Sequence, residues 1–231
     1  MAKFGKKYRA ILKDAPKQPV SVEEAIKFIK AHPAAKFDET LDVAFCLGTN
    51  CVRSDSPVRG TVKLPAGSGK NVKVLVFAGG EHADQAKAAG ADYVGMDDLI
   101  EKITKDGWCD FDVAIATIEA MKNVRKCARV LGPRGLMPNP KTGTVTDDPA
   151  TAVKEAKAGK VDFRMDKTGN VAVVAGKRSF DEAALVQNIK AVVAAVTAAK
   201  PASVKGVFIK SMSVSSTMGV GVPVVVAGEA E

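Results

Sequence analysis

Cysteine and histidine are scarce in this chain, which has only 4 Cys and 2 His among its 231 residues. A structural zinc site needs about four such ligands at short spacing. No C-x-x-C pair occurs, and neither histidine lies close to a cysteine in the sequence, so we expect no metal site. The four cysteines are Cys46, Cys51, Cys109 and Cys127. Cys46 alternates with the core positions of a strand, which predicts a buried free thiol.

Long apolar runs are missing too. The longest one near the end, residues 220–228, is interrupted by Gly221 and Pro223 and is too short to span a bilayer. No apolar core of a secretory signal follows the basic N-terminal residues. We therefore expect a cytoplasmic protein that does not associate with membranes.

The charge is distributed unevenly along the chain. Residues 1–67 carry a charge of +5 and residues 160–231 a charge of +3, while residues 68–159 hold 13 basic and 13 acidic side chains. A neutral middle between two basic ends indicates one basic domain, built from 1–67 and 160–231, with 68–159 inserted as a second domain. A basic surface points first to a polyanion, most often nucleic acid.

Apolar residues alternate with other residues in the two ends of the chain, over 41–47, 58–64 and 161–165. Such alternation is typical of an antiparallel sheet with one face packed on the core and the other exposed to solvent. The turn sequence 166–170, followed by apolar 171–174, predicts a hairpin.

Two capping boxes, at 21–24 and 179–182, predict the beginnings of helices in the same domain. The second helix should bury Leu185, Ile189, Val192 and Val196 and stop before Pro201. The basic domain is therefore predicted to be α+β, with its helices on one face of the sheet and the other face open to a partner.

The middle of the chain has a different pattern. Residues 72–78 and 113–116 are nearly continuous apolar runs, typical of strands buried on both faces. Helix-like sequence follows at 81–89 and 118–130, and a short strand at 91–94 leads to a helix over 97–105. This order predicts a small three-layer α/β domain with a parallel sheet.

Two glycine-bearing connections, 64–69 and 156–159, join the predicted domains. A double crossing permits hinge opening near 65–69 and 156–160, and two ordinary tight loops are the alternative. The sequence 67–70 is not a phosphate loop, because Leu64 stands where a glycine is required and Asn71 follows the lysine. We expect no cofactor.

Two further segments have alternative explanations. Residues 77–81 could hold a ligand at the end of a parallel strand, but Glu81 would repel phosphate, which favours a tight strand-to-helix turn. Residues 132–143 contain Arg134 and Lys141, which could contact phosphate, and a rigid surface loop explains the three prolines and three glycines equally well.

A run of small hydroxyl residues occupies 210–221. Ser211, Ser213 and Ser215 would share one face of a strand, where they could bond a ribose hydroxyl or a phosphate oxygen. Residues 217–219 would then form a tip in which Gly219 adopts unusual dihedrals and Met218 lies against a base. The alternative is a solvated edge strand with a flexible end.

Aromatic residues make up only 5% of the chain. Recognition of single-stranded RNA on a sheet usually needs exposed aromatic rings. Phe45 and Phe163 align with the apolar set, so we expect both in the core, whereas Phe37 lies among charged residues. The sequence therefore favours recognition of folded RNA by its shape.

Five segments together resemble one known family, that of bacterial ribosomal protein L-one. They are Phe37-Asp38-Glu39-Thr40, Val58-Arg59-Gly60-Thr61-Val62, residues 132–145, Phe163-Arg164-Met165-Asp166-Lys167 and Ser215-Ser216-Thr217-Met218-Gly219. The resemblance covers essentially the whole chain in order. It implies a split βαβ-type terminal domain with an inserted Rossmann-like domain.

The resemblance also implies a function. It predicts a non-catalytic protein, monomeric off the ribosome, that binds the large-subunit rRNA stalk, assists release of deacylated exit-site tRNA and represses its own operon mRNA. The implied RNA contacts are Lys36, Phe37, Glu39, Thr40, Arg164, Asp166, Lys167, Ser211, Thr217, Met218 and Gly219, and the hinge residues are Pro65, Gly67, Gly69 and Gly159. The chain departs from the family pattern at Val220, usually Pro, and at Ala172, often His.

Two other classes of function compete with this interpretation. An enzyme using the inserted domain would need a nucleophile with its base, a metal cluster or a phosphate loop, and the sequence shows none. A two-lobed binder of small molecules would close on the hinge, but such proteins usually carry an export signal.

Overall fold

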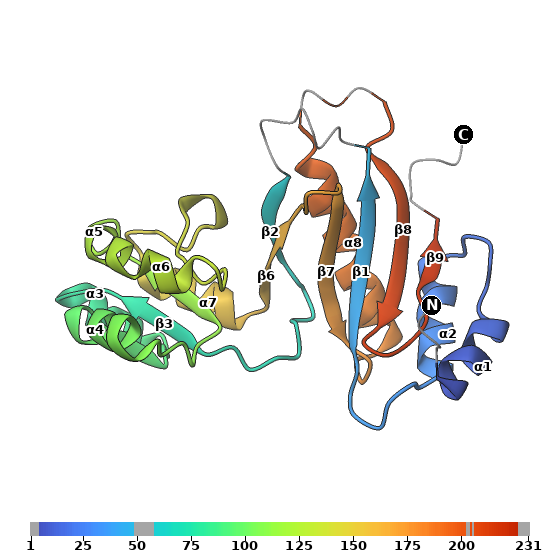
Figure 1. The fold of residues 1–231 in the computed structure, drawn as a ribbon, viewed down its shortest axis with the longest axis horizontal. Helices are drawn as coiled ribbons and strands as arrows, with labels where there is room; N and C mark the ends of the chain where they lie inside the picture. Colours follow the sequence, from blue (N-terminus) through green and yellow to red (C-terminus); the bar gives the residue numbers. More distant parts are fainter. Residues whose placement is uncertain (1–4, 49–57, 202–203, 205, 226–231) are drawn as a thin grey trace. The chain divides into compact units, whose positions relative to one another are not determined.

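The computed structural model describes residues 5–48, 58–201, 204 and 206–225; Cys51 lies outside them. The chain divides into two compact units, a terminal unit of Met1–Gly69 and Val161–Glu231 and an inserted unit of Lys70–Lys160 (Figure 1). Each unit combines helices with strands, so the expected mixed α/β class is confirmed. The domain boundaries at 67/68 and 159/160 and the hinge stay predictions.

The terminal unit contains a four-stranded antiparallel sheet in the order β7-β1-β8-β9 and a two-stranded sheet of β2 and β6. Its elements are α1 (Lys6–Asp14), α2 (Val22–Ala31), β1 (Thr40–Leu47), β2 (Arg59–Lys63), β6 (Lys160–Arg164), β7 (Asn170–Lys177), α8 (Glu182–Ala198), β8 (Ile209–Ser216) and β9 (Val222–Val224). Helices α8 and α2 pack on one face of the larger sheet (Figure 1).

The alternating sequence pattern correctly predicts this packing. Burial alternates along every residue of β1, with Leu41, Val43 and Phe45 in the core. The four apolar residues expected from α8 are all fully buried beneath the sheet, and Phe163 is buried as expected. Cys46 was wrongly expected to be buried, since it alternates with the core positions and so lies half-buried on the opposite face.

Two other expectations for the terminal unit are wrong. The turn at 166–170 joins strands of different sheets, because β6 pairs with β2 and β7 with β1. The predicted capping box at 179–182 does not form, and α8 has Asp181 as its N-cap residue. The Ser179 hydroxyl donates instead to Asp38, 2.8 Å away, so a tertiary partner replaces the local one. The box at Ser21 and Glu24 does form.

The inserted unit has a parallel sheet in the order β4-β3-β5. Its elements are β3 (Val74–Phe77), α3 (Glu81–Ala88), β4 (Tyr93–Gly95), α4 (Asp97–Asp106), β5 (Val113–Ala116), α5 (Met121–Val124), the 3-10 turn η1 (Arg125–Cys127), α6 (Ala128–Leu131), the 3-10 turn η2 (Pro140–Thr142) and α7 (Pro149–Lys157). Every residue of β3 is buried, and separate apolar clusters cover the two faces of the sheet, which confirms the predicted three layers.

The helix expected over 118–130 is interrupted. The helical segment begins at Met121 and consists of three short elements in succession: α5, the 3-10 turn η1 and α6. The amide of Asn123 bonds to the carbonyl of Ala120, three residues back, as in a tight 3-10 turn. The apolar periodicity of this segment is correct, because Val124, Cys127 and Leu131 are buried.

A buried side chain fixes the first of the two connections to the terminal unit. Asn188 of α8 is fully buried and accepts a hydrogen bond from the amide of Ala66 at 3.0 Å. It also donates to the carbonyl of Gly67 at 3.1 Å. Gly67, Gly69 and Gly159 all have positive φ angles, which other residues adopt with strain.

Candidate nucleic-acid interface

Residues 217–219, called the tip below, are held against the first residues of β1. The amide of Thr217 donates to the carbonyl of Thr40 at 3.0 Å. The Thr217 hydroxyl accepts a hydrogen bond from the amide of Thr40 at 3.0 Å. It also donates to the carbonyl oxygen of Thr40 at 3.3 Å. The polar groups of Thr217 are therefore engaged within the protein, where they fix the tip to β1.

Glu39 supports the tip from inside. Its side chain is 0% exposed. One carboxylate oxygen accepts the amide of Met218 at 3.3 Å, and the other accepts a guanidinium N–H of Arg178 at 3.3 Å. Because both oxygens face the protein interior, the side chain of Glu39 orients the tip backbone and is not part of the exposed surface. Arg178 is a residue that the sequence reasoning missed.

Gly219 is required for a different reason from the one expected. It is not among the described glycines with positive φ. A Cβ at this position would lie 2.3 Å from the hydroxyl oxygen of Ser216, which is nearly buried. Close packing inside the tip, rather than an unusual dihedral angle, therefore favours glycine here.

Two apolar side chains project from this end of β1. Phe37 is 55% exposed and Met218 is 59% exposed, although both are large and hydrophobic. An exposed ring and a polarisable thioether offer flat or adaptable surfaces to a base or a ribose. The expectation that Phe37 lies outside the core is confirmed.

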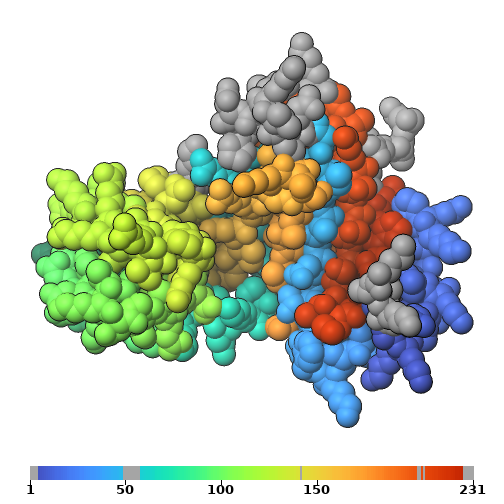
Figure 2. Space-filling model, in the orientation of Figure 1, coloured from blue at the N-terminus to red at the C-terminus, as the bar shows by residue number. Residues whose placement is uncertain are grey.

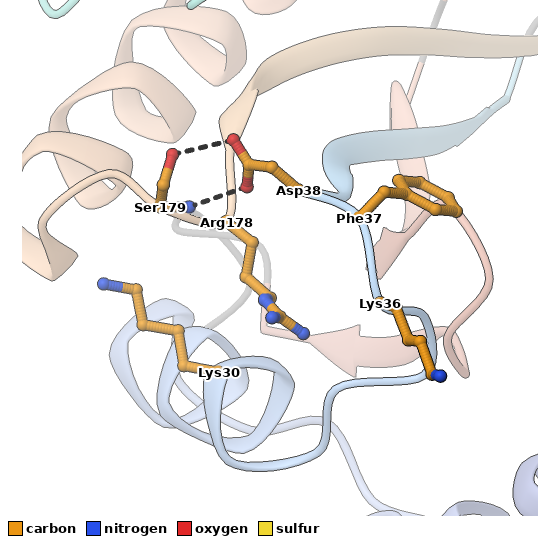
Figure 3. A pocket seen from close by; sticks show the side chains of 6 residues that line it. All are labelled: Lys30, Lys36, Phe37, Asp38, Arg178 and Ser179. Atoms are coloured by element: carbon orange, nitrogen blue, oxygen red, sulfur yellow. Dashed lines mark hydrogen bonds between the residues drawn. The ribbon is translucent and has the colours of Figure 1, made fainter.

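A cleft of about 480 Å³ adjoins these residues (Figure 3). It is lined by Lys30, Lys36, Phe37, Asp38, Arg178 and Ser179. The Asp38 carboxylate accepts the amide and the hydroxyl of Ser179 at 3.1 and 2.8 Å, which ties the segment before β1 to the end of β7. Figure 3 shows Lys36 and the ring of Phe37 directed away from the bonded pair of Asp38 and Ser179.

The remaining expected contacts lie at the other end of β1. Cys46 pairs with Asn170 on one side and with Ser211 on the other, and the amide of Leu47 bonds to the carbonyl of Gly169. The turn that carries Asp166 and Lys167 is thus about 23 Å from the tip, at ~3.3 Å per strand residue. The eleven expected residues therefore form two groups and not one cluster.

Asp166 organises its turn. Its carboxylate accepts the amides of Thr168 and Asn170 at 2.9 and 2.8 Å, and also the Thr168 hydroxyl. These bonds, led by the one from Asn170, hold the pKa of Asp166 below its usual range. Arg164 and Lys167 are exposed and available to an anion.

An open sheet face connects the two groups. It carries Asp42, Ala44 and Cys46 from β1, Ser211, Ser213 and Ser215 from β8, and Ala172 and Val174 from β7. Figure 2 shows β7, β1 and β8 side by side on this surface, in orange, light blue and red. The expected common face of the three serines is confirmed. Small side chains here let a rigid partner approach the backbone closely.

The inserted unit shows no comparable site at the positions flagged in the sequence. Gly80 has a φ of 56° and begins α3, as a tight turn requires. In the loop at 132–143, Asn139 bonds with Thr142 and Thr144, which makes the loop compact. Within the described residues, no group of three His, Cys, Asp or Glu side chains could hold a metal ion. Among the helices that the structure describes, none has the length and apolar character of a membrane-spanning helix.

Comparison with known proteins gives consistent matches. Residues 29–220 match the model of the Ribosomal protein L1p/L10e family. The chain is 57% identical over 203 residues to "Large ribosomal subunit protein uL1" of Ralstonia pickettii, which covers 88% of this chain and 87% of the relative. It is 52% identical over 225 residues to the protein of the same name from Burkholderia lata, covering 97% of both chains.

Proposed function

Because the chain belongs to the Ribosomal protein L1p/L10e family, a family of structural large-subunit proteins and not of enzymes, we propose that it binds the rRNA stalk of the large subunit through its terminal unit. Family membership confirms the resemblance found in the sequence and places the protein in the cytoplasmic ribosome. The eleven residues named from that resemblance are part of this proposal in two roles. Lys36, Phe37, Arg164, Lys167, Ser211 and Met218 meet the RNA, and Glu39, Thr40, Asp166, Thr217 and Gly219 hold the contact surface in shape.

The observation that carries the proposal is the open face of the terminal sheet, bordered at one end by the tip and at the other by the turn at 166–170. Small residues leave room along the face, and exposed Lys36, Arg164 and Lys167 supply cations near its ends. Such a surface suits a folded RNA, whose phosphates are attracted by the cations and whose ribose hydroxyls bond to polar groups.

The proposal has two further parts. The protein assists release of deacylated tRNA at the exit site, and it represses translation of its own operon by binding an mRNA segment that imitates the rRNA site. The connections at Pro65–Gly69 and at Gly159 act as the hinge between the two units, which work as separate domains. Gly67, Gly69 and Gly159 have positive φ angles that other residues adopt with strain, which explains glycine at these connections, and Asn188 sets the point at which the first connection leaves the terminal unit.

The test is a set of binding measurements on the full chain. We expect a transcript of the rRNA stalk to bind at least about a hundredfold more tightly than a shuffled transcript at physiological salt, within the usual range of specific recognition. The leader of the protein's own operon mRNA should compete for the same site. Equal affinity for stalk and shuffled transcripts would refute the proposal.

A further inference from the structure

The inserted unit is nearly neutral, yet one helical segment carries a row of cations. Elements α5, η1 and α6 run in succession and contain Lys122, Arg125, Lys126 and Arg129. These residues have the spacing i, i+3, i+4 and i+7, and all four are exposed, whereas Val124, Cys127 and Leu131 between and after them are buried. We call them the cationic stripe. The buried residues of the segment lie on the opposite face, toward the sheet.

The cationic stripe is not paired with any carboxylate of the part of the chain that the structure describes. Within the described residues, no ion pair joins any of its four members to an acidic side chain. Other lysines of the unit are paired, as Lys70 is with Asp112 at 2.6 Å and Lys73 with Asp110 at 2.9 Å. Like charges three and four residues apart destabilise a helix, so the stripe carries a repulsion that a bound polyanion would relieve.

The surroundings of the stripe extend the same surface. Arg134 is exposed just after α6 and adds a fifth cation. Ile118 is 58% exposed just before the segment. Helix α4, which packs beside η1, has Asp97, Asp98, Glu101 and Asp106 among its residues, and Glu101 is paired with Lys105 at 2.7 Å. Arg134 therefore continues the row of exposed cations, while α4 beside it holds acidic side chains.

We propose that the cationic stripe binds the phosphate backbone of double-helical RNA without reading its sequence. The four cations span about 10 Å along the helix axis at ~1.5 Å per residue. A row of this length can face more than one phosphate of the same strand. The inference rests on the proposed function only in taking RNA as the polyanion; it adds a second surface on the inserted unit, independent of the tip and the open sheet face.

The test compares two variants of the full chain that lose the same charge. The stripe variant carries K122Q, R125Q, K126Q and R129Q, and the control variant carries K87Q, K102Q, K105Q and K154Q on exposed helix positions of the same unit. Affinity is measured against salt concentration for a stalk rRNA transcript, deacylated tRNA and an arbitrary RNA duplex. Thermal melting checks that both variants fold, and R125K with R129K tests whether charge alone suffices.

We expect the stripe variant to lower the slope of log affinity against log salt by about two units or more for the arbitrary duplex, with at least about a tenfold loss at 50 mM salt. The control variant and the charge-preserving variant should keep the wild-type slope. The same change should appear wherever tRNA or the stalk transcript offers a duplex to the stripe, and a change confined to one of these two RNAs, with none for the arbitrary duplex, would contradict sequence-independent binding. Equal slopes for the stripe variant and wild type on all three RNAs would overturn the inference, as would an equal loss in the control.

The outcome is separable from that of the proposed function. If wild-type protein prefers the stalk transcript but the stripe variant behaves as wild type, only the inference about the inserted unit fails. If wild-type protein shows no preference among transcripts while the stripe variant still loses salt-dependent affinity, the stripe stands and the proposed stalk specificity fails.

Discussion

The two units leave different parts of their surfaces open to a partner. In the terminal unit, helices cover one face of the antiparallel sheet and the strands alternate between core and surface residues. In the inserted unit, apolar clusters cover both faces of the parallel sheet, so only helices and loops can meet a partner. An open sheet is a broad surface of fixed geometry suited to recognising shape, whereas a helix with a row of cations suits backbone contacts that ignore sequence.

The residues of the terminal unit that were expected to contact RNA fall into two groups, one bonded to the protein and one directed outward. Glu39, Thr40, Thr217 and Asp166 use their polar groups in hydrogen bonds to other parts of the protein, which fix the tip and the turn. Lys36, Phe37, Arg164, Lys167 and Met218 project outward. In the proposed interface, the first group holds the geometry and the second group meets the RNA, so substitutions can separate the two roles.

Glu39→Gln should have the largest effect on RNA affinity among these substitutions. A glutamine keeps one side-chain oxygen for two donors, so its NH2 group faces either Arg178 or the amide of Met218 and leaves opposed donors in a buried site, at a cost of ~1–3 kcal/mol. We expect stalk affinity to fall about tenfold or more, with an unchanged salt slope because no phosphate contact is lost. Glu23→Gln, on the exposed first turn of α2, is the matched control. A reduced slope would contradict a purely positioning role for Glu39.

Gly219→Ala should weaken binding by about tenfold. The added Cβ meets the Ser216 hydroxyl at 2.3 Å, and such overpacking costs ~1–3 kcal/mol. Adding Ser216→Ala removes the clashing oxygen, so the double variant should recover most of the affinity. The measurement is fluorescence anisotropy with a labelled stalk transcript, together with thermal melting. No recovery in the double variant would show that glycine is needed for another reason.

Removing the inserted unit should have a smaller effect on stalk recognition. A chain that joins 1–67 to 160–231 by a short linker should fold and stay within about tenfold of the full-length affinity at physiological salt, because the specific surface lies in the terminal unit. Circular dichroism and filter binding provide the measurements. A folded module that fails to bind would show that the assignment of RNA recognition to the terminal unit is wrong.

Asp42→Asn should have the smallest effect, and in the opposite direction. Partial burial raises the pKa of Asp42, so the folded protein holds the proton more tightly than the unfolded chain. Stability therefore falls as pH rises through the interval between the unfolded and folded pKa values, and the ionised group weakens the fold at neutral pH.

Replacing Asp42 should raise the melting temperature at pH 7 by no more than about 4 °C, the shift that ~1 kcal/mol produces in a domain of this size. It should also raise stalk affinity about twofold, since an anion leaves the open face. Well below the ordinary aspartate pKa of about 3.9 the two proteins should melt together. A lower melting temperature for the variant at pH 7 would contradict the assigned effect of burial.

The parts of the fold that depend on periodicity were predictable from the sequence. The alternating burial of β1, the buried strand β3 and the core face of α8 follow from residue spacing alone. The wrong predictions are those in which a residue or strand pairs with a part of the chain far away in the sequence and not with its sequence neighbour. Ser179 has the sequence of a helix cap but bonds to Asp38, and the turn at 166–170 joins two strands that pair with other strands.

The candidate site was predictable only as a set of residues. The sequence contains the row of serines, the isolated Phe37 and the family motifs. It contains no signal that Glu39 is buried or that Arg178, far away in the chain, is its partner, because that pairing exists only once β1 and β7 lie together. The spacing of the stripe at Lys122–Arg129 was visible in the sequence, but its exposure and lack of carboxylate partners were not.

By itself, the sequence determined the two kinds of sheet, the family and the uneven charge, because each depends on residue type and on spacing along the chain. The tertiary structure alone decided which of the expected contacts face outward and which hold the tip, and that they form two groups at opposite ends of β1. The physical reason is that burial and hydrogen bonding are satisfied between strands that the chain brings together from positions more than a hundred residues apart.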